Sequence, residues 1–200
     1  TIANPWKFAL PMGPSTWPER SSHQIRVRAS DAAGNVTTSP LITVKKGNNR
    51  DINGDGYEDF VASAHLYNTN RGGIYVHYGQ SGSIPSSTVA APTILSATNS
   101  DYYGRNTAMG DFNGDGFADL AVCSPGDGTA ALPGKVIIYH GQAGTLNTTP
   151  VTTLNGVSNL DLFGGMAITA DFDNDGYSDL ALGAIGYNAN SQIGRVYIYR

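Results

Sequence analysis

The sequence predicts an all-β fold built from a repeated antiparallel unit, and three observations support this prediction. An acidic nine-residue loop recurs every 60 residues, at 51–59, 111–119 and 171–179. A short apolar run bounded by glycine or proline follows each loop, as expected of a buried strand. The composition of the 200 residues, with 25 glycines, 11 tyrosines and 14% charged residues, is typical of many short strands and tight turns.

Each acidic loop has oxygen-bearing side chains at positions 1, 3, 5 and 9, with glycine at position 6. The oxygens of positions 1, 3 and 5 converge when such a loop curls around a cation, and the glycine permits the sharp turn. The carbonyl of position 7 and the carboxylate of position 9 would complete the oxygen shell. The sequence therefore predicts three Ca²⁺ sites, with ligands Asp51, Asn53, Asp55, Tyr57 and Asp59; Asp111, Asn113, Asp115, Phe117 and Asp119; and Asp171, Asp173, Asp175, Tyr177 and Asp179.

These loops differ from the helix–loop–helix calcium hand. That motif needs an acidic residue at position 12, where this chain has Ala62, Val122 and Leu182. Because apolar strand-like runs follow directly, we expect the loops to join strand to strand. The third loop has four carboxylates against three plus asparagine in the others, so we expect it to bind calcium most tightly.

Four strands are expected in each repeat. The apolar run after the loop is the first, and an alternating aliphatic and aromatic run led by glycine (Gly73, Gly134, Gly194) is the second. A third strand, expected in 88–97 and 150–154, is interpreted as an edge strand because Pro92 cannot donate a ladder hydrogen bond. A fourth precedes the next loop, at 103–110 and 163–169. Four antiparallel strands per repeat describe the blade of a β-propeller.

The order of motifs resembles the FG-GAP repeat of the integrin α-subunit propeller and its bacterial relatives. The naming dipeptide is found as Tyr103-Gly104 and Phe163-Gly164, and degenerate versions of the second half are found at 63–65, 123–125 and 183–185. The resemblance covers residues 48–200 and divides them into repeats at about 47–102, 103–162 and 163–200. It implies a propeller with calcium at loops on one rim, and usually a role in adhesion or recognition.

The repeats amount to about two and a half blades, because no aromatic-glycine strand precedes the first loop and no outer strand follows Tyr199. The integrin-type ring has seven. We therefore expect further sequence or another chain to complete the propeller. An array that ends within a blade should expose the strand around 196–199 and one face of the first blade.

Residues 1–46 differ from the repeats. The segment from His23 to Val44 is expected to form two strands around an Asp31-Ala-Ala-Gly-Asn35 turn, similar to the last hairpin of a bacterial immunoglobulin-like or fibronectin-like module. We interpret Asp31 as a turn residue. Trp6 and Trp17 are expected in core or interdomain packing, and a sugar-stacking platform is the alternative.

Charge and composition exclude several classes of partner. Three bound Ca²⁺ would change the formal charge from −4 to +2, and no basic stripe predicts nucleic-acid binding. No apolar run approaches the roughly 20 residues that span a bilayer.

The single cysteine, Cys123, is expected to be a small buried residue. Loops so dependent on carboxylates suit millimolar calcium, which indicates an extracellular location.

The four histidines form no recognisable catalytic constellation. His65, placed by the sequence at a blade turn near the calcium rim, is the best of these weak candidates. We therefore expect a non-catalytic extracellular module in which calcium is structural and which binds a protein or glycan. The alternative is the propeller part of a carbohydrate-active enzyme such as a polysaccharide lyase. A cluster of basic and aromatic side chains on one face would favour the enzyme, and Arg71, Arg105, Lys135 and Arg195 are the cations available within the repeats.

Overall fold

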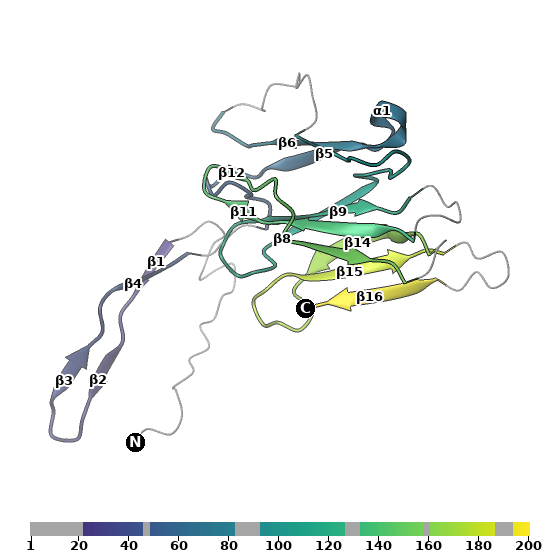
Figure 1. The fold of residues 1–200 in the computed structure, drawn as a ribbon. Helices are drawn as coiled ribbons and strands as arrows, with labels where there is room; N and C mark the ends of the chain where they lie inside the picture. The colour runs from purple at the N-terminus through teal and green to yellow at the C-terminus, as the bar shows by residue number, and fades with distance from the viewer. Residues whose placement is uncertain (1–21, 46–48, 83–92, 127–132, 158–160, 187–193) are drawn as a thin grey trace. The chain divides into compact units, whose positions relative to one another are not determined.

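The computed structural model describes residues 22–45, 49–82, 93–126, 133–157, 161–186 and 194–200, and nearly all of its regular structure is antiparallel sheet (Figure 1). The chain divides into two compact units, Thr1–Gly47 and Asn48–Arg200. Trp6, Trp17 and Pro92 lie outside the described residues.

The described part of the first unit, residues 22–45, is an interrupted hairpin. Strand β1 (Ser22–Ile25) pairs with β4 (Ile42–Lys45), and β2 (Arg28–Ser30) pairs with β3 (Val36–Thr38). In the turn, Asp31 Oδ1 accepts the N–H groups of Ala33 and Asn35, both at 2.9 Å, and Asn35 Nδ2 donates to Oδ2 at 2.7 Å. The bonds from Asn35 lower the pKa of Asp31 because they favour its charged form. The turn role of Asp31 is confirmed, whereas the immunoglobulin-like origin of the hairpin stays a prediction.

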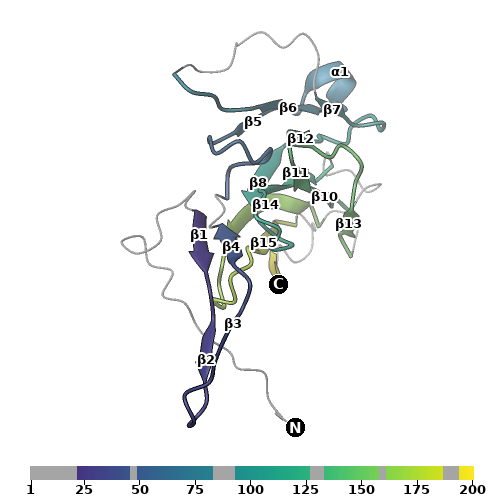
Figure 2. The same ribbon diagram turned by 90° about the vertical axis from the view of Figure 1, so that its left-hand side faces the viewer.

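The second unit contains three antiparallel sheets of three or four strands, which lie one above the other in both views (Figures 1 and 2). Blade 1 consists of β5 (Phe60–Ala64), β6 (Gly73–His77) and β7 (Ile94–Leu95). Blade 2 has the strand order β13 (Thr152–Asn155), β10 (Lys135–Tyr139), β9 (Asp119–Ser124) and β8 (Asn106–Gly110). Blade 3 consists of β14 (Phe163–Ala170), β15 (Asp179–Ala184) and β16 (Arg195–Tyr199). The predicted all-β partial propeller is confirmed.

Two small elements were not expected. Strands β11 (Gly141–Gln142) and β12 (Thr145–Leu146) form a short hairpin. The four-residue α1 (Tyr67–Asn70) is a tight turn rather than a regular helix, because Asn68 and Thr69 have φ values of 50° and 60° in the left-handed region.

Strand β9 shows how the blades are held together, since all six of its residues are buried. Leu120 and Val122 pack with Ile74 and Val76 of blade 1 in one apolar cluster. The alternate residues Ala121 and Cys123 pack in a second cluster, with Phe163, Leu180 and Leu182 of blade 3. A strand has two faces, and here each face meets a different neighbouring blade. Burial raises the pKa of the Cys123 thiol to about 12, so this cysteine is a packing residue, as predicted.

The strand register corrects the alignment of the repeats. His77 pairs with Phe60 as Tyr139 pairs with Leu120, so His77 corresponds to Tyr139. Gly72, not Gly73, corresponds to Gly134, because both have positive φ and leave no room for a Cβ against the next blade's backbone at Tyr103 or Phe163. The prediction that matched Gly73 with Gly134 is therefore wrong by one residue.

Candidate metal centre

The first two acidic loops have the same internal hydrogen bonds. The two carboxylate oxygens of Asp51 accept the N–H groups of Gly54 and Gly56 at 2.7 and 2.8 Å. The corresponding bonds to Asp111, from Gly114 and Gly116, are 2.7 and 2.9 Å long. Backbone donors thus fix the first carboxylate of each loop. Each of its oxygens retains a further lone pair for a cation.

Position 3 is linked to position 5 in the same two loops. Asn53 Oδ1 accepts the N–H of Asp55 at 3.0 Å, and Asn53 Nδ2 donates to the Asp55 carboxylate at 2.9 Å. Asn113 and Asp115 repeat both bonds, each at 2.9 Å. An asparagine at position 3 therefore supplies an acceptor oxygen. Its side-chain N–H also stabilises the negative charge of the carboxylate two residues later.

The closing aspartates at position 9 are buried in all three loops: Asp59, Asp119 and Asp179 are 3%, 0% and 1% exposed. Each accepts the N–H of its loop's position 2, at 2.7, 2.9 and 2.6 Å respectively. Burial is the main reason that the pKa of Asp119 is raised to about 6, and burial also raises the pKa of Asp59. A charged carboxylate at these positions is costly unless a cation compensates it.

The third loop brings three carboxylates together. Asp171, Asp173 and Asp179 each offer an oxygen within 4.8 Å of the other two, and within the described residues this is the one such group of acidic, histidine or cysteine side chains. These are positions 1, 3 and 9, and position 3 is asparagine in the other two loops. Asp175, expected in the same shell, is outside the cluster, and its Oδ1 accepts the N–H of Tyr177 at 2.9 Å.

The donor set is all oxygen and mostly anionic, which is the chemistry that Ca²⁺ prefers. The loops fit this ion because fixed carboxylates at positions 1 and 9 flank an oxygen-bearing side chain at position 3. Calcium would be held by these side chains and would neutralise their mutual repulsion.

The first two loops are also bonded to the following repeat. The carbonyl of Asp51 accepts the N–H of Ala118 at 2.8 Å, and the carbonyl of Asp111 accepts that of Ser178 at 2.8 Å. Asn53 accepts a further bond, from Gly144, at 2.8 Å. The candidate metal loops therefore form part of the blade-to-blade contact.

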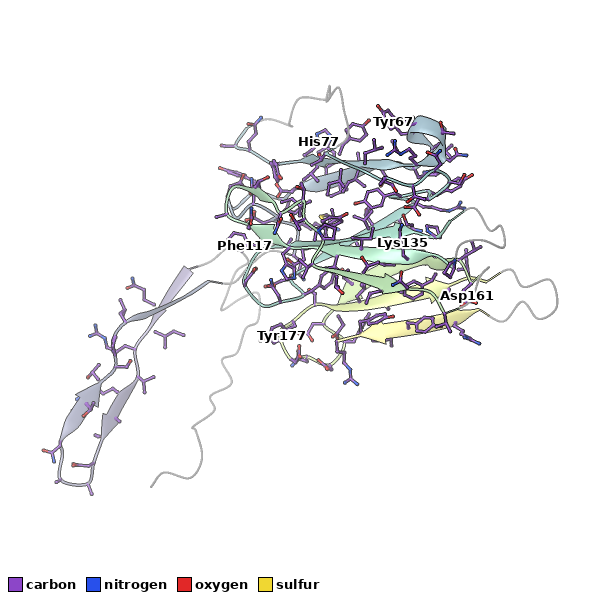
Figure 3. The ribbon with its side chains drawn as sticks, in the orientation of Figure 1. Tyr67, His77, Phe117, Lys135, Asp161 and Tyr177 are labelled. Atoms are coloured by element: carbon purple, nitrogen blue, oxygen red, sulfur yellow. The ribbon has the colours of Figure 1, made fainter. Side chains whose placement is uncertain are left out.

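An aromatic–glycine contact joins consecutive loops, and sequence reasoning missed it. A Cβ on Gly54 would collide with the ring of Phe117, and one on Gly114 would collide with the ring of Tyr177. The aromatic residue at position 7 thus covers the glycine at position 4 of the preceding loop. Figure 3 shows Phe117 and Tyr177 at the same edge of the second unit, opposite Lys135 and Asp161. The sequence offered one signal, because position 4 of each loop is glycine or asparagine. These residue types most readily adopt the positive φ values found at Gly54, Gly114 and Asn174, which are 74°, 75° and 60°.

The structure does not support a site around His65. Strand β5 begins directly after Asp59 and ends at Ala64, so His65 lies at the far end of this strand from the first loop. The prediction that His65 is near the calcium rim is wrong, because a five-residue strand separates the two by about 16 Å.

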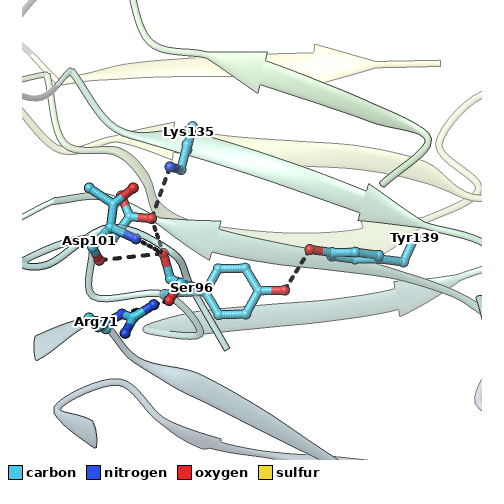
Figure 4. A network of polar contacts seen from close by, with 7 residues as sticks. Arg71, Ser96, Asp101, Lys135 and Tyr139 are labelled. Atoms are coloured by element: carbon cyan, nitrogen blue, oxygen red, sulfur yellow. Dashed lines mark hydrogen bonds and ion pairs between the residues drawn. The ribbon is translucent and has the colours of Figure 1, made fainter. Parts of the chain in front are cut away.

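Of the four cations named from the sequence, Arg71 and Lys135 take part in one structural network (Figure 4). Arg71 Nε donates to the carbonyl of Ser96 at 2.8 Å. The Oδ2 atom of buried Asp101 lies 2.9 Å from Lys135 Nζ and accepts the Ser96 hydroxyl at 2.6 Å. Arg195, the repeat equivalent of Lys135, lies within electrostatic range of Asp161. Lys135 therefore has an architectural role, as predicted, and the same role for Arg195 stays a prediction. Arg105 lines a small cavity of about 160 Å³ beside Leu162 and Ile185.

Comparison with known proteins agrees with the repeats seen in the structure. Residues 51–122 match the FG-GAP-like repeat family and residues 165–199 match the FG-GAP repeat family. Human integrin alpha-6 is 36% identical over 141 residues, which is 68% of this chain and 12% of that protein. Mouse integrin alpha-IIb is 32% identical over 164 residues, or 75% of this chain and 15% of its own length. The chain thus spans less than a sixth of these relatives.

The fold defines a propeller repeat with an acidic loop before one strand of each blade. With these matches, the chain is a protein of FG-GAP repeats, similar to integrin alpha subunits. The match shows the repeats but neither the bacterial type nor the immunoglobulin-like module.

Proposed function

We propose that this chain is an extracellular recognition or adhesion module, non-catalytic, whose propeller blades are stiffened by calcium. The observation that carries the proposal is the convergence of Asp171, Asp173 and Asp179, whose oxygens lie within 4.8 Å of one another on a loop that recurs three times. The predicted ligands are those at positions 1, 3, 5, 7 and 9 of each loop. Three Ca²⁺ would be held in the full set.

A structural role for calcium follows from where the loops are bonded. The Asp51 carbonyl accepts the N–H of Ala118 in blade 2, so the residue that offers the first ligand also joins two blades. A cation that fixes this loop would hold the blade contact as well. Calcium bound beside the buried Asp119 would offset the cost of burying this carboxylate's charge, a cost that raises its pKa to about 6.

The proposed role in recognition rests on similarity to integrin alpha subunits over about two-thirds to three-quarters of the chain. A protein or glycan is the proposed partner, and calcium loops of this composition suit extracellular concentrations. In the described residues, no helix has the length and apolar character needed to cross a membrane.

Calcium removal tests the structural role. Because ligand binding to the folded state contributes about 2.7 kcal/mol per site at a hundredfold excess over the dissociation constant, EDTA should lower the melting temperature clearly. Isothermal titration should give three sites. The matched control is Asp31→Asn, which removes a carboxylate from a turn outside the second unit. Its calcium stoichiometry should equal that of the unaltered chain.

Single-site variants assign the sites. Asp51→Asn, Asp111→Asn and Asp171→Asn should each remove or weaken one of three binding events. The calcium proposal fails if titration detects fewer than two sites or if EDTA leaves the melting curve unchanged.

A further inference from the structure

The residue that follows the second strand of each blade differs in charge along the repeats. The register aligns His77, Tyr139 and Tyr199, so the next residues, Tyr78, His140 and Arg200, are equivalent. Two of them contact position 3 of their own acidic loop. His140 Nδ1 lies 3.3 Å from Asn113 Nδ2, and Arg200 NH1 lies 3.3 Å from Asp173 Oδ2.

The charge at position 3 matches the charge of this neighbour. A neutral asparagine faces His140, whereas a carboxylate faces the guanidinium of Arg200. In the first loop, Tyr78 instead bonds to blade 2, where its hydroxyl oxygen accepts the N–H of Leu146 at 2.8 Å. The added negative charge of Asp173 thus occurs in the one loop where this position is an arginine.

We propose that Arg200 is a built-in counter-ion that sets the calcium affinity of the third loop by neutralising Asp173. In the first two loops, the asparagine Nδ2 donates to the carboxylate at position 5, at 2.9 Å in both. A carboxylate has no such donor, so Asp173 adds negative charge to the loop, and the N–H of Asp175 that donates to it at 3.3 Å is neutral. Arg200 supplies the missing positive charge from outside the loop.

The counter-ion opposes calcium binding at this loop. A cation bound by Asp171, Asp173 and Asp179 experiences repulsion from the guanidinium, and it shares the Asp173 carboxylate with Arg200. The fourth carboxylate of the loop then raises affinity less than its charge alone predicts. Because the Arg200 side chain is 69% exposed, the effect is moderate and screened by salt.

The inference rests on the proposed calcium function, and the test separates the two. Each loop contains its own reporter glycine at position 6, namely Gly56, Gly116 or Gly176. A calcium titration followed by amide NMR therefore gives three site-resolved dissociation constants in one sample. For Arg200→Gln, we expect binding at Gly176 to become about two- to five-fold tighter at low salt, with Gly56 and Gly116 unchanged.

Three further variants test whether the charge of Arg200 causes this change in affinity. Arg200→Lys keeps the charge and should retain the original affinity of the third loop. His140→Gln is the matched change at the second loop; because His140 faces the neutral Asn113, it should shift the Gly116 titration less than Arg200→Gln shifts that of Gly176. With Asp173→Asn as the background, Arg200→Gln should have a clearly smaller effect, because the paired carboxylate is absent.

The outcomes distinguish the counter-ion role of Arg200 from calcium binding by the loops. If calcium binds at Gly176 but Arg200→Gln changes neither the affinity nor its salt dependence, the counter-ion role is overturned and the calcium function stands. If no loop of the unaltered chain binds calcium, the proposed function itself fails.

Discussion

Equivalent strand positions are buried in blade 2 and exposed in blade 3. Val136 and Ile138 on β10 are 0% and 7% exposed, whereas their equivalents on β16, Val196 and Ile198, are 73% and 61% exposed. Both pairs lie opposite small residues of the neighbouring strand, which are Cys123 and Ala121 in blade 2. Blade 3 covers Val136 and Ile138, whereas no element among the described residues covers Val196 and Ile198. Burial here is a property of the blade pair and not of the strand sequence.

Exposure of position 2 of the acidic loops increases in the same way from the first loop to the third. Ile52, at position 2 of the first loop, is completely buried between blades 1 and 2. Phe112 is half-buried at the equivalent place, and Phe172 is 48% exposed. The exposed apolar face of blade 3 also includes Met166 and Ile168, and contiguous apolar faces of this kind mark interaction surfaces. That further sequence or another chain covers this face stays a prediction.

The largest effect should come from placing a charge at the two equivalent positions. Val136→Asp buries a carboxylate without a partner and should lower the free energy of unfolding by about 4 kcal/mol or more. Val196→Asp changes a side chain that is 73% exposed and should stay within about 0.5 kcal/mol. Urea unfolding of both variants measures the difference. Equal losses at the two positions would mean that a neighbouring element covers β16 in solution.

A second comparison concerns two glycines of the first loop. Gly54 and Gly56 both have positive φ, of 74° and 90°, but only Gly54 lies against another side chain, the ring of Phe117. Gly56→Ala should cost about 1–2 kcal/mol through backbone strain alone. Gly54→Ala should cost about 3 kcal/mol, because it adds a collision at the loop-to-loop contact.

Both alanine variants can be compared by thermal unfolding in saturating calcium, which keeps metal binding constant. Phe117→Leu in the Gly54→Ala background should recover part of the loss by making room for the Cβ. Identical costs for the two glycines would show that Phe117 moves aside freely.

Much of the repeat could be read from the sequence because its signals are local. The spacing of Asp51, Asp111 and Asp171 fixed the period, and the apolar runs after each loop are the observed β5, β9 and β15. The position-9 carboxylates were identified as loop members. Their burial could not be predicted, because it depends on strands of the same blade and on the blade that follows.

Features that depend on contacts between residues far apart in the sequence were missed. The contact of Gly54 with Phe117 joins residues in different repeats, and nothing within either loop requires it. The offset of Gly72 against Gly134 escaped alignment because the loops between the first and second strands differ in length. The counter-ion Arg200 is a residue at the end of a strand, far in sequence from the Asp173 that it contacts.

The smallest expected difference in stability is between removing the hydroxyl of Tyr139 in blade 2 and removing that of Tyr199, its equivalent in blade 3. The hydroxyl of Tyr103 donates to that of Tyr139 at 2.8 Å, and both side chains are buried between blades 1 and 2 (Figure 4). At the next interface, the equivalent of Tyr103 is Phe163, which has no hydroxyl, and the equivalent of Tyr139 is Tyr199.

Tyr139→Phe leaves the buried Tyr103 hydroxyl without its acceptor, so it should lower the free energy of unfolding by about 1–2 kcal/mol. At the position equivalent to Tyr103, Phe163 offers no hydroxyl to Tyr199, so Tyr199→Phe should change stability by less than about 0.5 kcal/mol. The double variant Tyr103→Phe with Tyr139→Phe removes both partners and should recover most of the loss, since no buried polar group is then left unpaired. Chemical denaturation of the four proteins decides the matter: if Tyr139→Phe costs no more than Tyr199→Phe, the hydroxyl pair does not contribute to the contact between blades 1 and 2.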